Sequence, residues 1–303
     1  MIINKYEKKK RLTFRDKFLN LFSSLTPKQR LISKLTQRAL RTDGLDKRLF
    51  SAVEIETVNR CNGKCAFCPV SAGNDQREYH KMSEDLFQKI ILQLEGLDYK
   101  GSLALFSNNE PFLDQRIENF AVYARQHLPN AFIYLYTNAS LLSLERYKKI
   151  ISYLDEMIID NYNDSLELNP NVQIINEFIQ DKENLFEKTK IHLRKEHEVL
   201  FSRGGNAPNK RNAKTLKMSC ILPFTQLIIR PDGKISLCSN DAYGEMTLGD
   251  ATEQSLKGIW FGDKCQEVRK ALRKGRKNNI LCRHCDSTFY PGQFGIRVKG
   301  DKR

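Results

Sequence analysis

Three cysteines lie within eight residues, as Cys61-x3-Cys65-x2-Cys68, in a stretch that we expect to be a loop leaving a strand. Three thiolates can hold three irons of a [4Fe–4S] cube, which normally takes four, so the fourth iron is left open to a small-molecule ligand. Zinc is the alternative, because clustered cysteines also bind zinc. No other Cys or His lies close in sequence to complete a zinc tetrahedron, so the spacing favours a cluster with an open iron.

A second group of cysteines follows more than 150 residues later, at Cys220, Cys238, Cys282 and Cys285. Four thiolates can close a complete [4Fe–4S] site, with a zinc ribbon as the alternative. Cys265 is left over in a predicted amphipathic helix. It is either a free thiol that donates a hydrogen atom to a substrate radical or a buried small hydrophobe.

The first motif, with an aromatic Phe67 before its last cysteine, resembles the signature of radical S-adenosylmethionine (SAM) enzymes. The resemblance implies that SAM binds the open iron of a [4Fe–4S] cluster and is cleaved to a 5′-deoxyadenosyl radical. That radical abstracts a hydrogen atom from the substrate, while the protein positions the cofactor. The matching region covers about residues 51–205.

The resemblance also implies which residues contact SAM. Ser107-Asn-Asn-Glu-Pro111 stands where the family usually has Gly-Gly-Glu-Pro, and Thr137-Asn138-Ala139 where it commonly has Thr-Asn-Gly. All these residues end predicted parallel strands, where barrel active sites form. The residues implied in cofactor binding are Phe67, Asn109, Glu110, Thr137, Asn138, Asp160 and Asn161.

The C-terminal cysteines, with Gly233-Lys-Ile-Ser-Leu-Cys238 and the Gly258-Ile-Trp-Phe-Gly-Asp263 phrase, resemble the SPASM module in its shortened twitch form. The longer form holds two clusters and has further cysteines after its Cys-x2-Cys pair. This sequence has none after Cys285, so we predict one auxiliary [4Fe–4S] cluster.

Strands and helices must alternate to position these residues. Runs rich in β-branched and aromatic residues predict six strands, at 51–59, 101–108, 131–138, 155–163, 188–194 and 197–203. Helical spacing predicts helices between most of them, at 83–95, 113–127, 141–154 and 170–180. The alternation predicts an α/β fold, a partial (β/α)6 TIM-like barrel over residues 49–215.

The chain ends in a different pattern. Residues 225–239 predict a hairpin around a Pro-Asp-Gly turn, and 253–274 a helical segment. We therefore expect a small cysteine-rich α+β SPASM/twitch domain over residues 216–303.

The chain begins with a basic segment. Residues 1–48 carry 14 Lys and Arg against four Asp and Glu, out of a net charge of +14 for the chain. Apolar spacing predicts two amphipathic helices, at 12–25 and 27–41. This helical extension either docks on an anionic membrane surface or a partner, or packs on the enzyme body. Because the excess charge belongs to this appendage, we expect no nucleic-acid partner.

The 303 residues are 40% hydrophobic and 28% charged, which is ordinary for a globular protein. No run of 18 apolar residues or apolar signal sequence occurs. Clustered thiols are typical of reducing compartments, so we expect a cytoplasmic protein.

Three functions are compatible with these features. Similar enzymes with the shortened module include an aminocyclitol dehydrogenase, so the first is oxidation or epimerisation of a sugar, aminocyclitol or similar small molecule. The second is peptide modification, disfavoured because a 48-residue helical extension lacks the strands of a leader-binding domain. The third is a non-catalytic metal-binding scaffold. We expect a reductase, flavodoxin or ferredoxin as electron donor. Arg203, at the end of the last predicted strand, is a candidate anchor for a substrate oxygen, or else a solvated Arg.

Overall fold

The computed structural model describes residues 1–4, 6, 31, 34, 38, 40, 47–211 and 213–288. Within these residues, nine strands form one sheet in the order β1-β6-β5-β4-β3-β2-β7-β8-β9. The strands are β1 (Ile2–Asn4), β2 (Ala52–Ile55), β3 (Ser102–Ala104), β4 (Phe132–Thr137), β5 (Glu156–Tyr162), β6 (Thr189–Arg194), β7 (Gln226–Ile229), β8 (Lys234–Ser236) and β9 (Thr247–Asp250).

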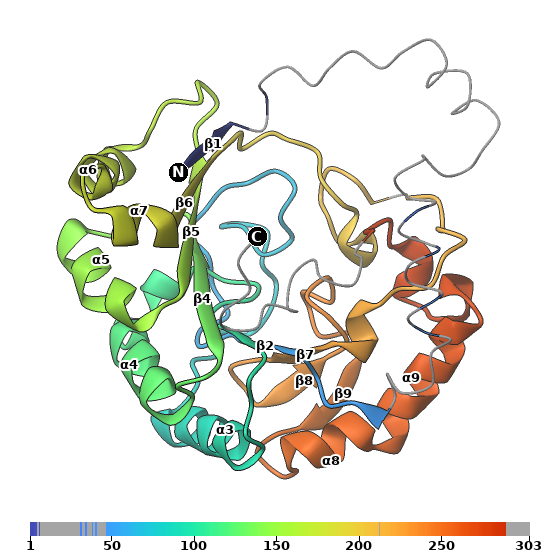
Figure 1. The fold of residues 1–303 in the computed structure, drawn as a ribbon. Coiled ribbons are helices and arrows are strands. Elements are labelled where there is room, and N and C mark those ends of the chain that lie inside the picture. Colours follow the sequence, from blue (N-terminus) through green and yellow to red (C-terminus); the bar gives the residue numbers. More distant parts are fainter. Residues whose placement is uncertain are drawn as a thin grey trace.

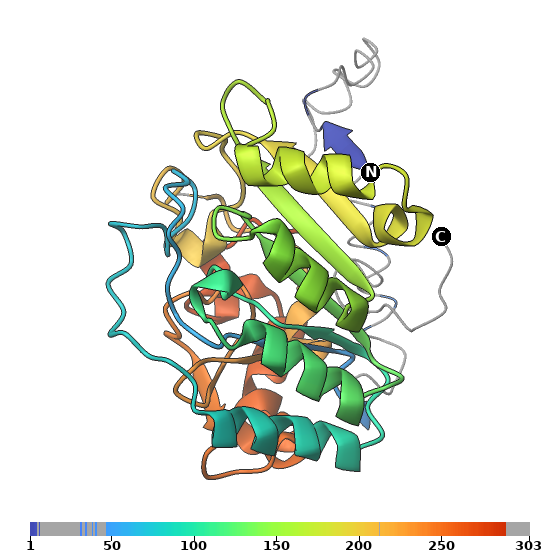
Figure 2. The same cartoon turned by 90° about the vertical axis from the view of Figure 1, so that its left-hand side faces the viewer.

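Neighbouring strands from β1 to β7 in this order are all parallel. Figure 1 shows these strands curving into an open barrel, and Figure 2 shows the helices that cover its outer face. The helices are α3 (Glu84–Gly96), α4 (Ile117–His127), α5 (Leu144–Ile150), α6 (Pro170–Ile179), α7 (Glu183–Lys188), α8 (Leu256–Phe261) and α9 (Asp263–Arg273).

The helix that follows β2 and the three-cysteine loop shows how sequence positions these elements. The helix α3 starts at Ser83, whose hydroxyl accepts a hydrogen bond from the Leu86 amide at 3.1 Å. Its Phe87, Ile90 and Leu94 are buried against the sheet. This apolar stripe packs the helix on the outer face of the sheet.

The predicted C-terminal hairpin is confirmed, and it continues the sheet of the barrel. Its first strand, β7, pairs in parallel with β2, with Val53 opposite Leu227. Its second strand, β8, pairs antiparallel with β7, and β9 follows antiparallel with β8. The cysteine-rich segment is therefore joined to the barrel through backbone hydrogen bonds.

The prediction of a strand over 197–203 is wrong. After β6 the chain turns, because Arg194 Nε donates to the Glu198 Oε1 four residues later at 2.5 Å. Val199 is 62% exposed and therefore packs on no sheet. The place beside β6 is taken instead by β1, which lies at the start of the chain.

Most of the predicted helical extension over 1–48 lies outside the described residues, including the helix at 12–25 and the surface expected to dock on a membrane or partner. Residues 2–4 form a strand, so the expectation that this segment has no strand is wrong. Leu40 is helical and buried beside Cys220 and Cys282. Among the described residues, no helix is long and apolar enough to cross a lipid bilayer.

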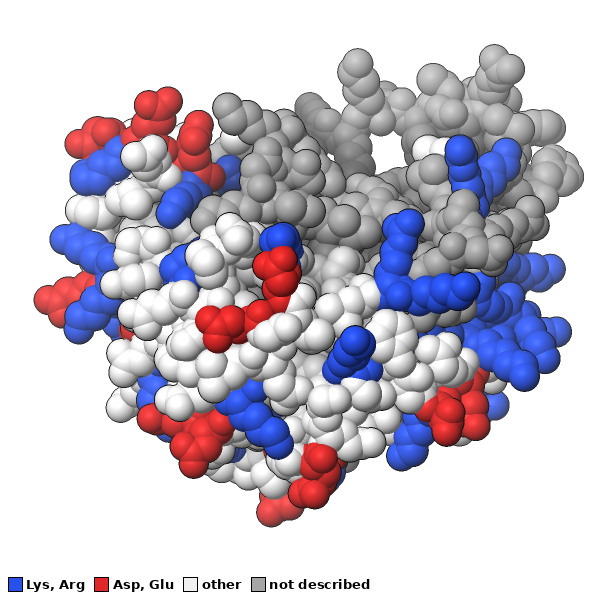
Figure 3. Space-filling model, turned by 60° about the horizontal axis from the view of Figure 1, so that its bottom comes forward, with Lys and Arg blue, Asp and Glu red and all other residues white. Residues whose placement is uncertain are grey.

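Charged side chains of both signs are scattered over the face drawn in Figure 3. Lys and Arg gather on the side of the molecule where α9 lies (Figure 3). Exposed cations on and just after this helix include Lys264, Lys270, Arg273, Lys274 and Lys277. This part of the surface is basic.

Candidate active site and two cysteine sites

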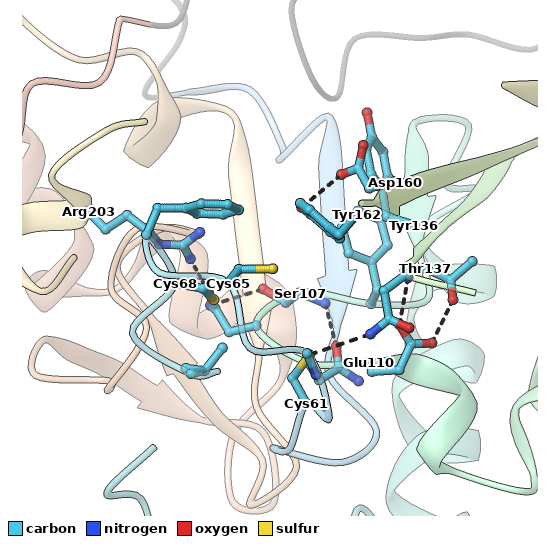
Figure 4. A pocket seen from close by; sticks show the side chains of 17 residues that line it. Cys61, Cys65, Cys68, Ser107, Glu110, Tyr136, Thr137, Asp160, Tyr162 and Arg203 are labelled. Atoms are coloured by element: carbon cyan, nitrogen blue, oxygen red, sulfur yellow. Dashed lines mark hydrogen bonds between the residues drawn. The ribbon is translucent and has the colours of Figure 1, made fainter. Parts of the chain in front are cut away.

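A pocket opens at the carboxyl ends of the parallel strands, and Figure 4 shows the side chains that line it. All three cysteines of the first motif lie in its wall. Six of the seven residues predicted to bind the cofactor also line it, namely Phe67, Asn109, Glu110, Thr137, Asn138 and Asp160. The fold thus places six of these seven residues in one pocket wall.

The loop that carries the three cysteines is held by its own backbone. The Gly63 amide donates to Cys61 Sγ at 3.3 Å, and the Cys68 amide donates to the Cys65 carbonyl at 3.1 Å. The Ala72 amide closes the loop by donating to the Gly63 carbonyl at 2.7 Å. The loop therefore presents its sulfur atoms in a fixed arrangement.

These sulfurs suit a positively charged metal cluster. A Cβ added at Gly63 would lie 3.4 Å from Cys61 Sγ and 3.8 Å from Cys65 Sγ, so the glycine leaves a cradle between the two. Burial, with Glu110 and Cys68 nearby, raises the pKa of the Cys61 thiol to about 12. Bound iron would reverse this effect, because a coordinating thiol loses its proton. Three cysteine sulfurs in one pocket wall therefore fit the [4Fe–4S] cluster that the radical SAM signature implies.

Glu110 fixes the end of β4 against the end of β3. Its buried carboxylate accepts hydrogen bonds from Thr137 Oγ1 at 2.7 Å, from the Asn138 amide at 2.8 Å and from the Phe112 amide at 3.1 Å. Burial raises the pKa of this carboxyl, although these three donors oppose the shift. The structure thus gives Glu110 an architectural role as well as a place in the pocket wall.

Two polar atoms in the wall are buried without a protein partner. Asn109 Nδ2 makes no hydrogen bond within the described part of the chain, although its Oδ1 accepts from the Ser107 amide at 3.0 Å. Arg203 Nε is likewise unpaired there. An unsatisfied buried donor costs free energy, so both atoms fit a site completed by a bound group.

Asp160 and Asn161 are adjacent on β5 and point to opposite sides of the sheet, as successive strand residues must. Asp160 lies in the pocket, where Oδ1 contacts His192 Nδ1 at 3.0 Å. Asn161 is fully buried away from it, donating to the Glu167 carbonyl at 2.9 Å and accepting from the Asn169 amide at 2.8 Å. The prediction that Asn161 reaches SAM is therefore wrong.

A neighbouring pocket lies between the barrel and the cysteine-rich segment. Arg203, Phe67 and Ser107 line both pockets, whereas Leu222, Ser239 and Asn240 come from the segment that holds Cys220 and Cys238. Arg203 is in a short turn, Arg203–Gly205, rather than at a strand end. Its guanidinium donates to Asn108 Oδ1 and to the Ser239 carbonyl, the latter at 2.8 Å. It therefore links the barrel to the cysteine-rich segment.

Sequence reasoning missed Glu54, which is in the wall of this second pocket. Its carboxylate accepts from Ser107 Oγ at 2.7 Å and from Gln226 Nε2 at 2.5 Å. Burial raises the pKa of Glu54 to about 7, against the opposing effects of Ser107 and Arg203. An acid at an inward position of an otherwise apolar strand was the available signal.

The four cysteines of the second group come from three separate segments and meet in a buried cluster. Cys220 precedes a short turn, Cys238 follows β8, and Cys282 and Cys285 flank a single turn of helix. All four are buried. Burial raises the pKa of the Cys238 thiol well above its usual value, and the other three thiols add to the shift. Four buried thiols, three of which act on the pKa of Cys238, match the number of ligands that a closed [4Fe–4S] site takes.

The frame of this second site is buried and polar. Arg276 donates to the carbonyls of Met218, Cys285 and Ser287, at 3.0, 3.0 and 2.7 Å. Asp241 accepts from the amide of Leu237, next to Cys238, at 3.2 Å. These bonds tie the segments together.

The structure does not bring Cys265 to either pocket. It lies on α9, is 2% exposed and packs in the main hydrophobic core together with Trp260. Burial raises the pKa of its thiol. The interpretation as a hydrogen-atom donor is therefore wrong, and the residue is a small core hydrophobe.

Two family models match separate parts of the chain. Residues 55–199 match the radical SAM superfamily model, and residues 220–286 match SPASM, an iron–sulfur cluster-binding domain. S-adenosyl-L-methionine-dependent 2-deoxy-scyllo-inosamine dehydrogenase of Niallia circulans is 28% identical over 245 residues, which cover 79% of this chain and 94% of that protein.

Solved structures agree. BtrN in complex with AdoMet and 2-DOIA superposes with a TM-score of 0.69 at 25% identity, covering 80% of this chain and 95% of that chain. Streptococcus suis SuiB bound to S-adenosylmethionine superposes with a TM-score of 0.52 at 13% identity, covering 80% of this chain and 73% of that chain. The second likeness concerns the fold alone.

Proposed function

The chain belongs to the radical SAM superfamily and carries a C-terminal SPASM domain, and from this premise we propose that it oxidises a secondary alcohol of an aminocyclitol or similar polar ring. The observation that carries the proposal is the 245-residue match, which covers 94% of a dehydrogenase of an aminocyclitol. The second pocket supports it, because a few polar side chains, Glu54, Arg203 and Asn240 among them, converge in its largely apolar wall between the two cysteine sites.

Cys61, Cys65 and Cys68 would hold the cluster that binds SAM, with Phe67, Asn109, Glu110, Thr137, Asn138 and Asp160 around the cofactor. When bound, the cluster and SAM supply a 5′-deoxyadenosyl radical that removes a hydrogen atom from the substrate. The residues of the wall orient SAM and keep water from the reacting carbon.

Oxidation of an alcohol to a ketone releases two electrons and two protons. One electron and one proton leave together as the abstracted hydrogen atom. Glu54, at the wall of the second pocket, accepts the hydroxyl proton, and Arg203 stabilises the negative charge that develops on the oxygen. Cys220, Cys238 and the C-terminal cysteine pair would hold an auxiliary cluster, which would supply an acceptor for the remaining electron.

Oxidation is favoured over epimerisation by the position of Cys265. An epimerase returns a hydrogen atom to the substrate radical and needs a donor in the pocket. Cys265 is in the core. In the described residues, the other cysteines belong to the two clustered sites.

We also propose an acidic flavodoxin or ferredoxin as electron donor, in the cytoplasm. The basic surface around α9 suits an acidic carrier, because complementary charge speeds association. Eight free cysteines suit a reducing compartment. Raising the salt concentration should slow carrier-driven turnover much more than dithionite-driven turnover. Equal salt dependence with both reductants would contradict the proposal.

The direct test is anaerobic reconstitution followed by incubation with SAM, dithionite and 2-deoxy-scyllo-inosamine. We expect 5′-deoxyadenosine and a ketone product in equal amounts. The matched control omits dithionite and should give neither. Cleavage of SAM without a ketone from this substrate or related aminocyclitols would overturn the proposed substrate class.

A further inference from the structure

The first residues of the chain complete the barrel at its edge. Ile2, Ile3 and Asn4 pair in parallel with Ile191, His192 and Leu193 of β6, and Figure 1 shows β1 beside that strand. The Met1 nitrogen donates to the Thr189 carbonyl at 2.9 Å, and the Ile191 amide donates to the Met1 carbonyl at 2.9 Å. Segments almost 190 residues apart in sequence are thus held together by backbone bonds.

Two residues after β1, Tyr6 makes hydrogen bonds to the loop that follows β6. Its hydroxyl donates to Glu198 Oε2 at 2.9 Å and accepts from the Lys195 amide at 3.3 Å. The Tyr6 amide donates to Asn4 Oδ1 at 2.9 Å, which turns the chain so that the ring reaches this loop. One phenol therefore contacts both the backbone and a carboxylate of segment 194–198.

The same segment supports the SAM pocket in two ways. Arg194 Nε donates to Glu198 Oε1 on one side. On the other side its guanidinium lies over the rings of Phe67 and Tyr162, at 5.8 and 5.6 Å. Its guanidinium also lies 3.6 Å from Asp160 Oδ1. The Glu196 carbonyl accepts the amide of Ala66, inside the three-cysteine loop, at 2.9 Å.

We propose that residues 2–4 together with Tyr6 form an N-terminal strap that positions the SAM pocket through Tyr6, Glu198 and Arg194. The strap touches neither SAM nor substrate, so Tyr6 and Glu198 are positioning residues. They fix the guanidinium that orients Phe67 and Asp160, and they fix the loop whose carbonyl holds the three-cysteine motif. The proposal rests on SAM binding and not on the identity of the substrate.

The exposure of the strap residues indicates that they position the pocket rather than contribute to the overall stability of the fold. Ile2 is 45% exposed and Tyr6 39% exposed, so the strap removes little apolar surface from water. The side chain of Arg194, which the strap holds, is only 8% exposed. Loss of the strap should therefore shift the position of a buried charge in the pocket rather than unfold the barrel.

The test measures SAM binding to the reconstituted enzyme by calorimetry in Tyr6→Phe and Glu198→Gln variants. We expect the dissociation constant for SAM to rise about fivefold in Tyr6→Phe and about tenfold in Glu198→Gln, as for loss of a hydrogen bond to a charged group. The KM for SAM should rise by the same factors while kcat at saturating SAM stays close to wild type. The melting temperature should change little.

Controls separate the strap from nonspecific effects. Tyr153→Phe and Glu187→Gln remove the same groups elsewhere and should leave the SAM dissociation constant unchanged. Because Tyr6 acts through Glu198, the double variant should bind SAM no more weakly than Glu198→Gln alone. Hydrogen exchange of residues 61–72, measured without SAM, should be faster in both strap variants than in the controls.

Two results would overturn the proposal. One is an unchanged SAM dissociation constant in both strap variants. The other is a lower melting temperature with unchanged SAM affinity, which would make the strap a stability element only. Failure to oxidise any aminocyclitol would overturn the proposed function and leave this test intact, since it is read without substrate.

Discussion

The two cysteine sites are built in opposite ways. The first takes all its thiols from one loop of eight residues, and Cys61 and Cys68 remain partly exposed to the pocket. The second takes four thiols from three segments spread between residues 220 and 285, and all four are buried. A local, open set leaves one iron for a ligand, whereas a dispersed, closed set leaves none.

The surroundings differ in the same sense. Glycine, amides and unpaired donors border the open site, as a place that receives a cofactor requires. Around the closed site, the buried Arg276 satisfies three carbonyls of the chain. The difference fits the proposed roles, in which the first site carries the reactive chemistry and the second accepts an electron from substrate bound between them.

The largest effect should follow removal of the open site. Replacing Cys61, Cys65 and Cys68 by Ala should abolish SAM cleavage, because no ligands remain for the cluster that SAM binds. The fold should persist, since the loop is at the surface of the pocket and the core is made by the sheet and helices. Formation of 5′-deoxyadenosine measures the loss, and circular dichroism checks the fold. Residual cleavage would place the reactive cluster elsewhere.

Removal of the closed site should uncouple the reaction. In Cys282→Ala/Cys285→Ala we expect SAM cleavage to continue while ketone formation is lost, because the second electron has no acceptor. The melting temperature should also fall, since a bound cluster contributes to the stability of its folded ligand set. Ketone production at the wild-type rate would contradict the proposed electron acceptor.

Glu54→Gln should act on the step between the two sites. A proton acceptor contributes about a hundredfold or more to rate, so kcat/KM for the substrate should fall by about that factor. SAM affinity should be unaffected, because Glu54 lines only the second pocket. With a pKa of about 7, Glu54 is deprotonated as the pH rises, so wild-type kcat/KM should increase through pH 7. The pH profile of Glu54→Gln should lack this increase in kcat/KM. If the increase is retained, it is caused by a group other than Glu54.

The same carboxyl predicts a pH dependence of stability. The pKa of Glu54 is raised from 4.5 to about 7 on folding, so the folded state binds more protons between these values. Its contribution to stability is therefore full below about pH 4.5 and is lost as the pH rises towards 7. The quantity to measure by calorimetry is the melting temperature of the wild type minus that of Glu54→Gln. This difference should be smaller at pH 8 than at pH 5. An equal difference at both pH values would contradict the shift.

The smallest effect should come from Cys265. Cys265→Ala removes one buried sulfur from the core and should cost about 1 kcal/mol, or a few degrees of melting temperature. SAM cleavage and ketone formation should match the wild type. Loss of ketone with normal SAM cleavage would restore a chemical role for this thiol.

Local patterns predicted much of this molecule. The cysteine spacing and the strand-end residues predicted the family and most of the pocket, because those features are contiguous in sequence. Spatial partners were harder. Asn161 was misplaced because one residue of strand register changes the face, and 197–203 failed because an ion pair between Arg194 and Glu198 overrides strand propensity. The partnership of β1 with β6 spans the chain and has no local signal.

The central claim is that the open site cleaves SAM and the closed site accepts the substrate electron. The most direct test is the molar ratio of ketone to 5′-deoxyadenosine in wild type and in Cys282→Ala/Cys285→Ala, with iron content measured in both. The account predicts a ratio near one with about eight irons in wild type, and a ratio near zero with about four irons in the variant. A ratio near one in a variant that has lost four irons would contradict it.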